Sequence, residues 1–314
     1  MRYGIGSLCL LLVSVLSADC GDLAPARGVP PPTPREWSLA TLNLWRFRDA
    51  IRHSDLDEPL SPALLEQRVQ ALADFIGGTL QAPHLLALQE VENRGLLDRL
   101  VARLAAAGWK YRAILKEGND PSGMDVGVLY RDPVQVASAQ GMFASQRFQG
   151  HALFSRPPLR VRILRPWRFL LVVVHQRSAR GLGKSTVYEK RQRQAAWLAN
   201  WVRRQSSPLI VAGDFNSTWG AGQFAASYAR FAQAGLFNVW QYLPVHERYS
   251  FRYRCRPQAL DHIWVSDALK PGIRRVAASR GNAGRYHSLY GSEGVSPVSD
   301  HDALVLYGER ELEE

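Results

Sequence analysis

The 314-residue chain is poor in cysteine, with only Cys9, Cys20 and Cys255. Their spacing matches no zinc site, which argues against a zinc centre built on thiolates. Cys9 lies in a segment that we expect to be removed. Cys20 and Cys255 could then form one disulfide in an oxidising compartment or serve as two separate thiols, and the sequence leaves both open.

The chain also lacks two enzyme motifs and any long hydrophobic run. It has no Gly-x-Ser-x-Gly elbow of a serine hydrolase. "GLGKST" at 181–186 resembles a phosphate-binding loop, but that pattern needs glycine at the position of Ser178. The apolar run from about Ile5 to Leu16 is too short to span a bilayer. These absences argue against acyl transfer, nucleoside-triphosphate hydrolysis and a stable membrane span.

The N-terminal region predicts export. We interpret residues 1–18 as a signal peptide cleaved near Ser17 or Ala18, so the protein is expected to be secreted or periplasmic. Lipid attachment at Cys20 is the less favoured alternative, because Asp19 precedes it where a small uncharged residue is expected. Residues 19–36 are rich in proline and predict an extended linker. One domain is expected over 37–308, followed by an acidic tail at 309–314.

Acidic residues are fewer than basic ones, 28 against 39, which gives a formal net charge of +11. Such an excess suggests a polyanionic partner, either nucleic acid or an anionic lipid surface. General surface basicity is the alternative.

Apolar runs alternate with amphipathic segments along the domain. Helices are predicted from Ser61 to Gly78, from Leu96 to Gly108, and over 187–204. Strands are predicted over 37–45, 84–93, 125–131, 159–164, 168–176, 208–215, 259–266 and 303–308. This order predicts an α/β domain with sheets inside and helices outside.

Several predicted strands carry acids, amides or histidines at one end. They are Asn43, Gln89, Glu90, His175, Asp214, Asn216, Asp261, His262, Asp300 and His301. An ion that leaves water without a partner is costly, so six such strand ends are difficult to explain as independent accidents. We therefore expect them to meet at one site.

The residue types at these ends indicate a chemistry. The carboxylates of Glu90, Asp214 and Asp300 are hard oxygen donors that suit Mg²⁺ or Ca²⁺. Two histidines and two amides can hold an anionic oxygen as charge develops. A carboxylate beside each histidine is expected to fix its tautomer and raise its pKa. Metal, histidine and asparagine together favour phosphate-ester hydrolysis over acyl transfer.

Seven motifs in order carry a resemblance. They are "TLNLW" at 41–45, "LLALQEVEN" at 85–93, "GMDVGVLYR" at 123–131, "VVVHQRS" at 172–178, "IVAGDFNS" at 210–217, "LDHIWVS" at 260–266 and "SDHDALVL" at 299–306. Together they resemble the endonuclease/exonuclease/phosphatase superfamily, and "GMDVGVLYR" is most similar to its secreted bacterial nucleases. The resemblance implies an α/β fold, a four-layer α/β sandwich in which two packed mixed β-sheets are flanked by helices.

The resemblance also implies roles for individual residues. Glu90 matches a metal-binding glutamate, Asn43 an asparagine that supports metal and phosphate, and Asp300 a metal ligand or its support. Asp214 and Asn216 match the pair that handles the attacking water. His301 and Asp261 match a catalytic histidine and its carboxylate, and His175 matches a second catalytic histidine with Asp125 as its expected partner. Mg²⁺ is the expected cofactor, with Ca²⁺ or Mn²⁺ as alternatives, and the number of metals stays open.

Two positions depart from the pattern. Trp45 stands where some relatives carry an acid, which removes one ligand for a second metal. His84 stands where aspartate is usual, and we expect only a structural change there. His262 and Glu92 are expected to be structural or exposed.

We expect a monomeric nuclease acting on a nucleic acid substrate, DNA or alternatively RNA. Arg156 and Arg177 are candidate substrate contacts, the second in a basic loop at 175–185. The alternatives are a sphingomyelinase-like or other phosphate-ester hydrolase and an inactive binding protein on the same fold. Whether cleavage is internal or terminal stays open.

Overall fold

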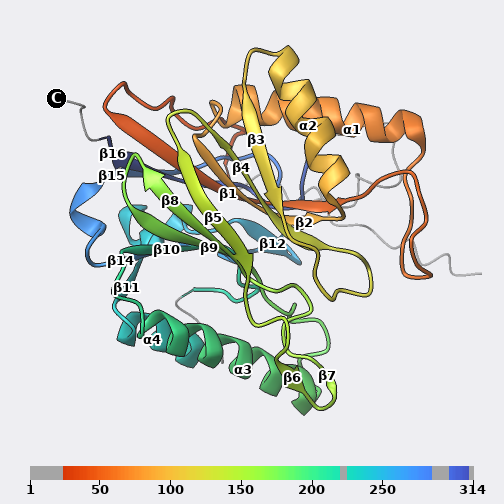
Figure 1. Ribbon diagram of the computed structural model, residues 1–314, viewed down its shortest axis with the longest axis vertical. Helices are drawn as coiled ribbons and strands as arrows, with labels where there is room; N and C mark the ends of the chain where they lie inside the picture. The colour runs from red at the N-terminus through yellow and green to blue at the C-terminus, as the bar shows by residue number, and fades with distance from the viewer. Residues whose placement is uncertain (1–23, 220–224, 285–296, 311–314) are drawn as a thin grey trace, which may run out of the picture.

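Two β-sheets pack face to face between two pairs of helices (Figure 1). The computed structural model describes residues 24–219, 225–284 and 297–310. Helices α1 (Pro62–Asp74) and α2 (Arg94–Ala106) lie at the top of the view, over one sheet. Helices α3 (Ser185–Val202) and α4 (Ala225–Gln233) lie at the bottom, over the other. The predicted four-layer sandwich is confirmed.

Each sheet has six strands. The first contains, in spatial order, β15 (Ile273–Ala278), β16 (Leu304–Glu309), β1 (Glu36–Phe47), β2 (Leu85–Val91), β4 (Asp125–Arg131) and β3 (Tyr111–Leu115). The second contains β11 (Leu236–Asn238), β14 (Asp261–Ser266), β10 (Leu209–Asp214), β9 (Phe169–His175), β8 (Leu159–Arg165) and β5 (Gln135–Gly141). Two small hairpins are formed by β6 (Arg147–Phe148) with β7 (His151–Ala152) and by β12 (Phe251–Tyr253) with β13 (Arg256–Gln258).

The central strands are apolar on both faces because each sheet is covered twice. In β10, Ile210 and Ala212 face the core between the sheets, whereas Leu209 and Val211 face the core beneath α3 and α4. This alternation explains the unbroken run "LIVAG".

The strand directions bring the polar ends together. Each sheet has one parallel pair, β1 with β2 and β9 with β10, and their C-terminal ends lie at one edge. Asn43 pairs with Gln89, and Asp214 with His175. β14 runs antiparallel to β10, so its first residue, Asp261, pairs with Asp214. β16 is antiparallel to β1, so the segment just before Leu304 reaches the same edge.

Local signals predicted the first helix well. Ser61 accepts a hydrogen bond from the Leu64 N–H (3.2 Å), and Pro62 occupies the first turn. The chain then continues as a π-helix over Phe75–Thr79, through the glycines that were expected to end it. Strand β5 was not predicted, because it is an edge strand with mostly exposed side chains and no apolar alternation.

Part of the segment at 24–35, which was expected to be an extended linker, is held against the domain, although most of its side chains are exposed. Val29 is buried and its N–H donates to the Thr79 carbonyl (2.9 Å), while Arg27 pairs with Arg280 through the backbone. An apolar side chain and paired backbone groups hold this segment in place. The predicted signal peptide lies outside the described residues.

Cys255 takes part in a disulfide, and the other two cysteines, Cys9 and Cys20, lie outside the described residues. Within the described ranges, no helix combines the length and the apolar character needed to cross a bilayer.

Gly213 is the residue on which the end of β10 depends. Its φ is +142°, and a Cβ built there would lie 2.0 Å from the Val174 carbonyl oxygen of the neighbouring strand. Any side chain would therefore separate β9 from β10 beside Asp214.

We predict that Gly213→Ala lowers the free energy of unfolding by about 3 kcal/mol or more, since it combines backbone strain with overpacking. Gly141→Ala is the matched control, because a Cβ there meets nothing within 4 Å. Urea unfolding of both variants checks this, and equal stabilities would contradict it.

Candidate active site

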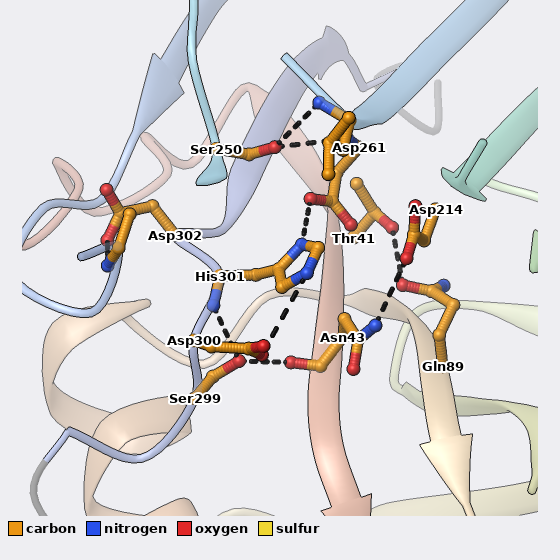
Figure 2. Close-up of polar contacts among 12 residues, drawn as sticks. Thr41, Asn43, Gln89, Asp214, Ser250, Asp261, Ser299, Asp300, His301 and Asp302 are labelled. Atoms are coloured by element: carbon orange, nitrogen blue, oxygen red, sulfur yellow. Dashed lines mark hydrogen bonds and ion pairs between the residues drawn. The ribbon is translucent and has the colours of Figure 1, made fainter. Parts of the chain in front are cut away.

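Side chains from both sheets meet at the shared edge (Figure 2). The Asn43 amide donates to Glu90 Oε1 (3.1 Å) and to Asp214 Oδ2 (3.2 Å). Glu90 Oε2 accepts from the Arg46 N–H (2.8 Å). One amide thus joins an acid of the first sheet to an acid of the second, and both carboxylates are held with oxygens available to a cation.

The backbone around these acids is unusual. Trp45, Arg46, Glu90 and Asn216 have positive φ values of 43°, 51°, 59° and 51°. Residues other than glycine rarely adopt this conformation, and such residues persist only where surrounding contacts fix them. The strain is concentrated where the strands end, next to the polar groups that they present.

Two buried arginines fix these strained loops, one from each helical layer. The Arg68 guanidinium on α1 donates to the carbonyls of Leu44 and Trp45, the second at 2.9 Å. On α3, Arg191 donates to the Arg177 carbonyl, and its Nη2 lies 2.6 Å from both the Asn216 carbonyl oxygen and Ser217 Oγ. Both helices therefore hold the site through side-chain to backbone bonds.

Asp214 and Asn216 form a compact pair. Asp214 Oδ1 accepts from the Asn216 N–H (2.7 Å), and its Oδ2 accepts from the Asn216 amide (3.1 Å). Burial, together with the charge of Asp261, raises the pKa of Asp214 to about 7. A carboxylate with such a pKa is suited to accept a proton near neutral pH.

His301 is paired with Asp261. Its Nδ1 lies 2.5 Å from Asp261 Oδ2, and the Ser250 hydroxyl accepts the Asp261 N–H (3.0 Å). Figure 2 shows this chain from Ser250 through Asp261 to the imidazole. Burial alone lowers the pKa of His301, but the charges of Asp261 and Asp300 raise it well above its ordinary value. His301 is therefore a cation at neutral pH.

His175 differs from His301. Its Nε2 lies 3.4 Å from Asp214 Oδ2 and 3.9 Å from Glu90 Oε1. Burial, with the charges of Arg156 and His301, lowers the pKa of His175 well below its ordinary value. The expectation of a raised pKa is wrong for this histidine, because desolvation outweighs the nearby acids.

Asp125 does not hydrogen-bond to His175. His175 Nδ1 is buried without a hydrogen-bond partner among the described residues. Asp125 instead interacts with Glu117 and with the Gly118 N–H, and burial followed by the Glu117 interaction raises its pKa to about 8. The predicted pairing of Asp125 with His175 is therefore wrong.

Asp300 offers a further oxygen. Its Oδ1 is buried without a hydrogen-bond partner in the described part of the chain, 3.9 Å from His301 Nε2. Burial raises the pKa of Asp300 to about 6; the His301 charge lowers it and the Glu90 charge raises it. An oxygen without a hydrogen-bond partner beside other acids fits a divalent cation, with Glu90 and Asp300 as oxygen donors and Asn43 as a support that donates its amide to Glu90.

The two arginine candidates differ in position. Arg156 Nε donates to the His175 carbonyl (3.4 Å) and its Nη1 donates to Asp120 (2.8 Å), which places it beside the site. Arg177 donates from Nη1 to Ser178 Oγ (2.7 Å) and from Nη2 to the Arg180 carbonyl (3.4 Å), so its guanidinium bonds within its own loop.

Both departures from the motif pattern are accounted for. His84 is buried, and its Nδ1 accepts the Ser38 N–H (3.1 Å) while burial lowers its pKa to about 3, consistent with the expected structural role. Trp45 supplies a carbonyl to Arg68 and a backbone N–H to Asn43 Oδ1 (2.8 Å).

His262 is buried and contacts Tyr228, Asn238 and the Ser217 carbonyl, so it also occupies a structural position.

Sequence reasoning missed Arg191, although a signal existed. Arg191 precedes Ala195 by four positions and Leu198 by seven, so it lies on the apolar stripe of its helix, where a charge requires partners. Glu92, which was expected to be structural or exposed, is buried. It accepts the Asp49 N–H (2.6 Å), groups with Asp49 and His53, and burial raises its pKa to about 7.

Asp300→Asn tests the metal assignment through stability. The pKa of the Asp300 carboxyl rises from its ordinary value of 3.8 to about 6 in the folded chain, so the folded state holds this proton more tightly than the unfolded state does. The wild-type protein therefore loses stability as the pH rises from about 4 through about 6. In chelator, we expect the variant to gain about 1 kcal/mol or more over wild type between pH 4 and pH 7.5.

Differential scanning calorimetry measures this gain, and Mg²⁺ should then raise the Tm of wild type more than that of the variant. A pH-independent difference, or equal stabilisation by Mg²⁺, would contradict the assignment.

The fold has close counterparts among solved structures. An endonuclease/exonuclease/phosphatase family protein from Leptotrichia buccalis matches with a TM-score of 0.59 and 14% identity, over 88% of this chain and 100% of that chain. The 3′ phosphatase NExo from Neisseria, bound to product DNA hairpin, matches with a TM-score of 0.59 and 15% identity over 88% and 100%. Truncated TDP2 from Caenorhabditis elegans matches with a TM-score of 0.56 and 16% identity, over 87% of this chain and 98% of that chain.

Among curated proteins, no sequence matches this chain. The family model described as Endonuclease/Exonuclease/phosphatase family matches residues 40–301, which is more than half of the chain and contains every residue of the site. The chain therefore belongs to the endonuclease/exonuclease/phosphatase family.

Proposed function

We propose that the protein is an exported, monomeric, Mg²⁺-dependent phosphodiesterase that hydrolyses nucleic acid, with DNA as the first candidate. The observation that carries the proposal is that the titratable groups of the site hold different protonation states at one pH. One histidine is cationic, the other is neutral, and Asp214 titrates near neutral pH beside a set of oxygen donors. Groups whose pKa values are driven apart in one site are suited to act as acid and base.

The side chains have distinct tasks in this proposal. Glu90 and Asp300, supported by Asn43, hold the cation, which would polarise the phosphate and stabilise charge on its oxygens when bound. Asp214 accepts a proton from the attacking water, and the Asn216 amide keeps that carboxylate oriented. His301, held by Asp261, donates to a phosphoryl or leaving oxygen, and neutral His175 adds a further donor.

The substrate is proposed from charge. The net charge of +11 favours a polyanion, and Arg156 lies next to His175 where a phosphate would approach. One structural neighbour, the 3′ phosphatase NExo from Neisseria, is bound to product DNA hairpin, which agrees with this choice. No observation favours lipid, and the complete catalytic set argues against an inactive binding protein.

Export is proposed from the apolar segment within residues 1–18. The disulfide at Cys255 supports this, because disulfides persist in oxidising compartments outside the cytoplasm.

Glu90→Gln should reduce activity by about 100-fold or more, since the neutral amide weakens the charge that holds the cation. The fold should persist, because the substitution keeps the side-chain volume and one of the two acceptor oxygens, which can still accept from the Arg46 N–H or from the Asn43 amide. Glu66→Gln, an exposed acid on α1, is the control and should retain full activity. Wild-type rates in Glu90→Gln would refute the metal assignment.

The substrate class is tested with purified protein and plasmid DNA, RNA and sphingomyelin in parallel, each with Mg²⁺ or with chelator. We expect Mg²⁺-dependent cleavage of nucleic acid and loss of cleavage in chelator. Hydrolysis of the lipid alone would overturn the nuclease proposal while leaving the phosphodiesterase site intact.

A further inference from the structure

The hairpin formed by β12 and β13 has an unusual composition that the mechanism above does not use. Its sequence, "FRYRCRPQ" at 251–258, contains three arginines, one tyrosine, one phenylalanine and no acid. The two turn residues, Arg254 and Cys255, have φ values of 47° and 62°, typical of the tight turn that joins paired strands.

The base of this hairpin is attached to the catalytic residues. The Ser250 N–H donates to the Gln258 carbonyl (3.0 Å), and the Ser250 hydroxyl accepts the Asp261 N–H (3.0 Å). The Asp302 N–H donates to the Ser250 carbonyl (2.7 Å). The hairpin therefore begins between the carboxylate that holds His301 and the residue that follows His301.

One face of the hairpin continues outward from the reacting centre. The Phe251 ring lies 4.8 Å from the His301 ring. Phe251 pairs with Gln258 and Tyr253 pairs with Arg256, so these four side chains share a face because paired residues and alternate residues point to the same side. Following that face from His301, Phe251 comes first and Tyr253 and Arg256 come next.

The outer part of the hairpin is exposed and its charge is not neutralised. The Tyr253 side chain is 51% exposed, and Arg254 and Arg256 are exposed. In the described ranges, neither arginine forms an ion pair, and Arg254 lies 5.4 Å from the centre of the Tyr253 ring. Some exposed arginines elsewhere do have acidic partners, such as Arg94 with Asp98 and Arg274 with Glu309.

We propose that the hairpin binds the nucleic acid strand beside the reacting phosphodiester. Arg254 and Arg256 contact phosphate oxygens, and Tyr253 stacks against a base. Two residues of a strand span about 7 Å, which equals about two nucleotide steps along a duplex, so Tyr253 is positioned about two nucleotides farther from the reacting centre than Phe251. This inference rests on the proposed function and specifies how its substrate is held.

The composition of the tip favours a nucleic acid over a membrane. A segment that enters a lipid interface presents several large apolar side chains together. Here the turn carries Arg254, Arg256 follows at the start of β13, and the single large ring exposed on the hairpin is that of a tyrosine.

The test compares Arg254→Ala/Arg256→Ala with Arg203→Ala/Arg204→Ala. The control pair is exposed and removes the same charge, but it lies before β10, at the end of that strand opposite to Asp214. Fluorescence anisotropy with a labelled oligonucleotide, in chelator so that no cleavage occurs, gives Kd at several salt concentrations. We expect Kd to rise about tenfold or more and the salt slope to fall by about two for the hairpin variant alone.

Tyr253→Ala should also weaken binding, and Tyr253→Phe should restore it, because the stacking surface is retained. The kcat for bis(p-nitrophenyl) phosphate, which is too small to reach the hairpin, should be unchanged in all these variants. Thermal unfolding verifies that each variant is folded.

Equal Kd and equal salt slope in wild type and the hairpin variant would overturn the proposal. Hairpin-dependent binding to phosphatidylglycerol vesicles, without binding to the oligonucleotide, would overturn it in favour of a lipid surface. Hairpin-dependent oligonucleotide binding by a protein that does not cleave with Mg²⁺ would support the hairpin and refute the proposed hydrolysis, so the two failures are distinguishable.

Discussion

The structure depends on negative charge concentrated at one sheet edge. Glu90, Asp214, Asp261 and Asp300 meet there largely shielded from water, and burial together with neighbouring acids raises the pKa of Asp214 and of Asp300. Such a cluster is costly unless cations and hydrogen-bond donors surround it. The Asn43 amide and the protonated ring of His301 provide part of that compensation, and a divalent cation among the oxygen donors would provide more.

The rest of the fold serves to hold this cluster. The parallel pair in each sheet brings the C-terminal ends of four strands to the same edge, and Gly213 permits the close approach of β9 and β10. Arg68 and Arg191 then fix the strained loops from opposite helical layers. The buried positive charge of Arg191 is also attracted to Asp214, so the side chain that orders the loop reduces the electrostatic cost of the site.

The two histidines show how position determines chemistry. Both are buried, His175 at the end of β9 and His301 just before β16, yet Asp261 keeps His301 protonated, whereas Nδ1 of His175 has no hydrogen-bond partner in the described part of the chain and the ring lies near Arg156. The same residue type thus supplies a cationic donor on one side of the reacting space and a neutral ring on the other. Groups that hold opposite protonation states at one pH are suited to act as acid and base.

The sequence alone determined most strands of the two sheets, the Ser61 cap and the set of polar residues that meet, because these follow from local periodicity and from motifs within single strands, whereas the four layers were implied by the family resemblance. Only the tertiary structure decided the opposite pKa directions of His175 and His301, the separation of Asp125 from His175, and the loop contacts of Arg177. The hairpin beside His301 also emerged only from the fold. These properties depend on burial and on distances between segments far apart in the chain, which local pattern does not contain.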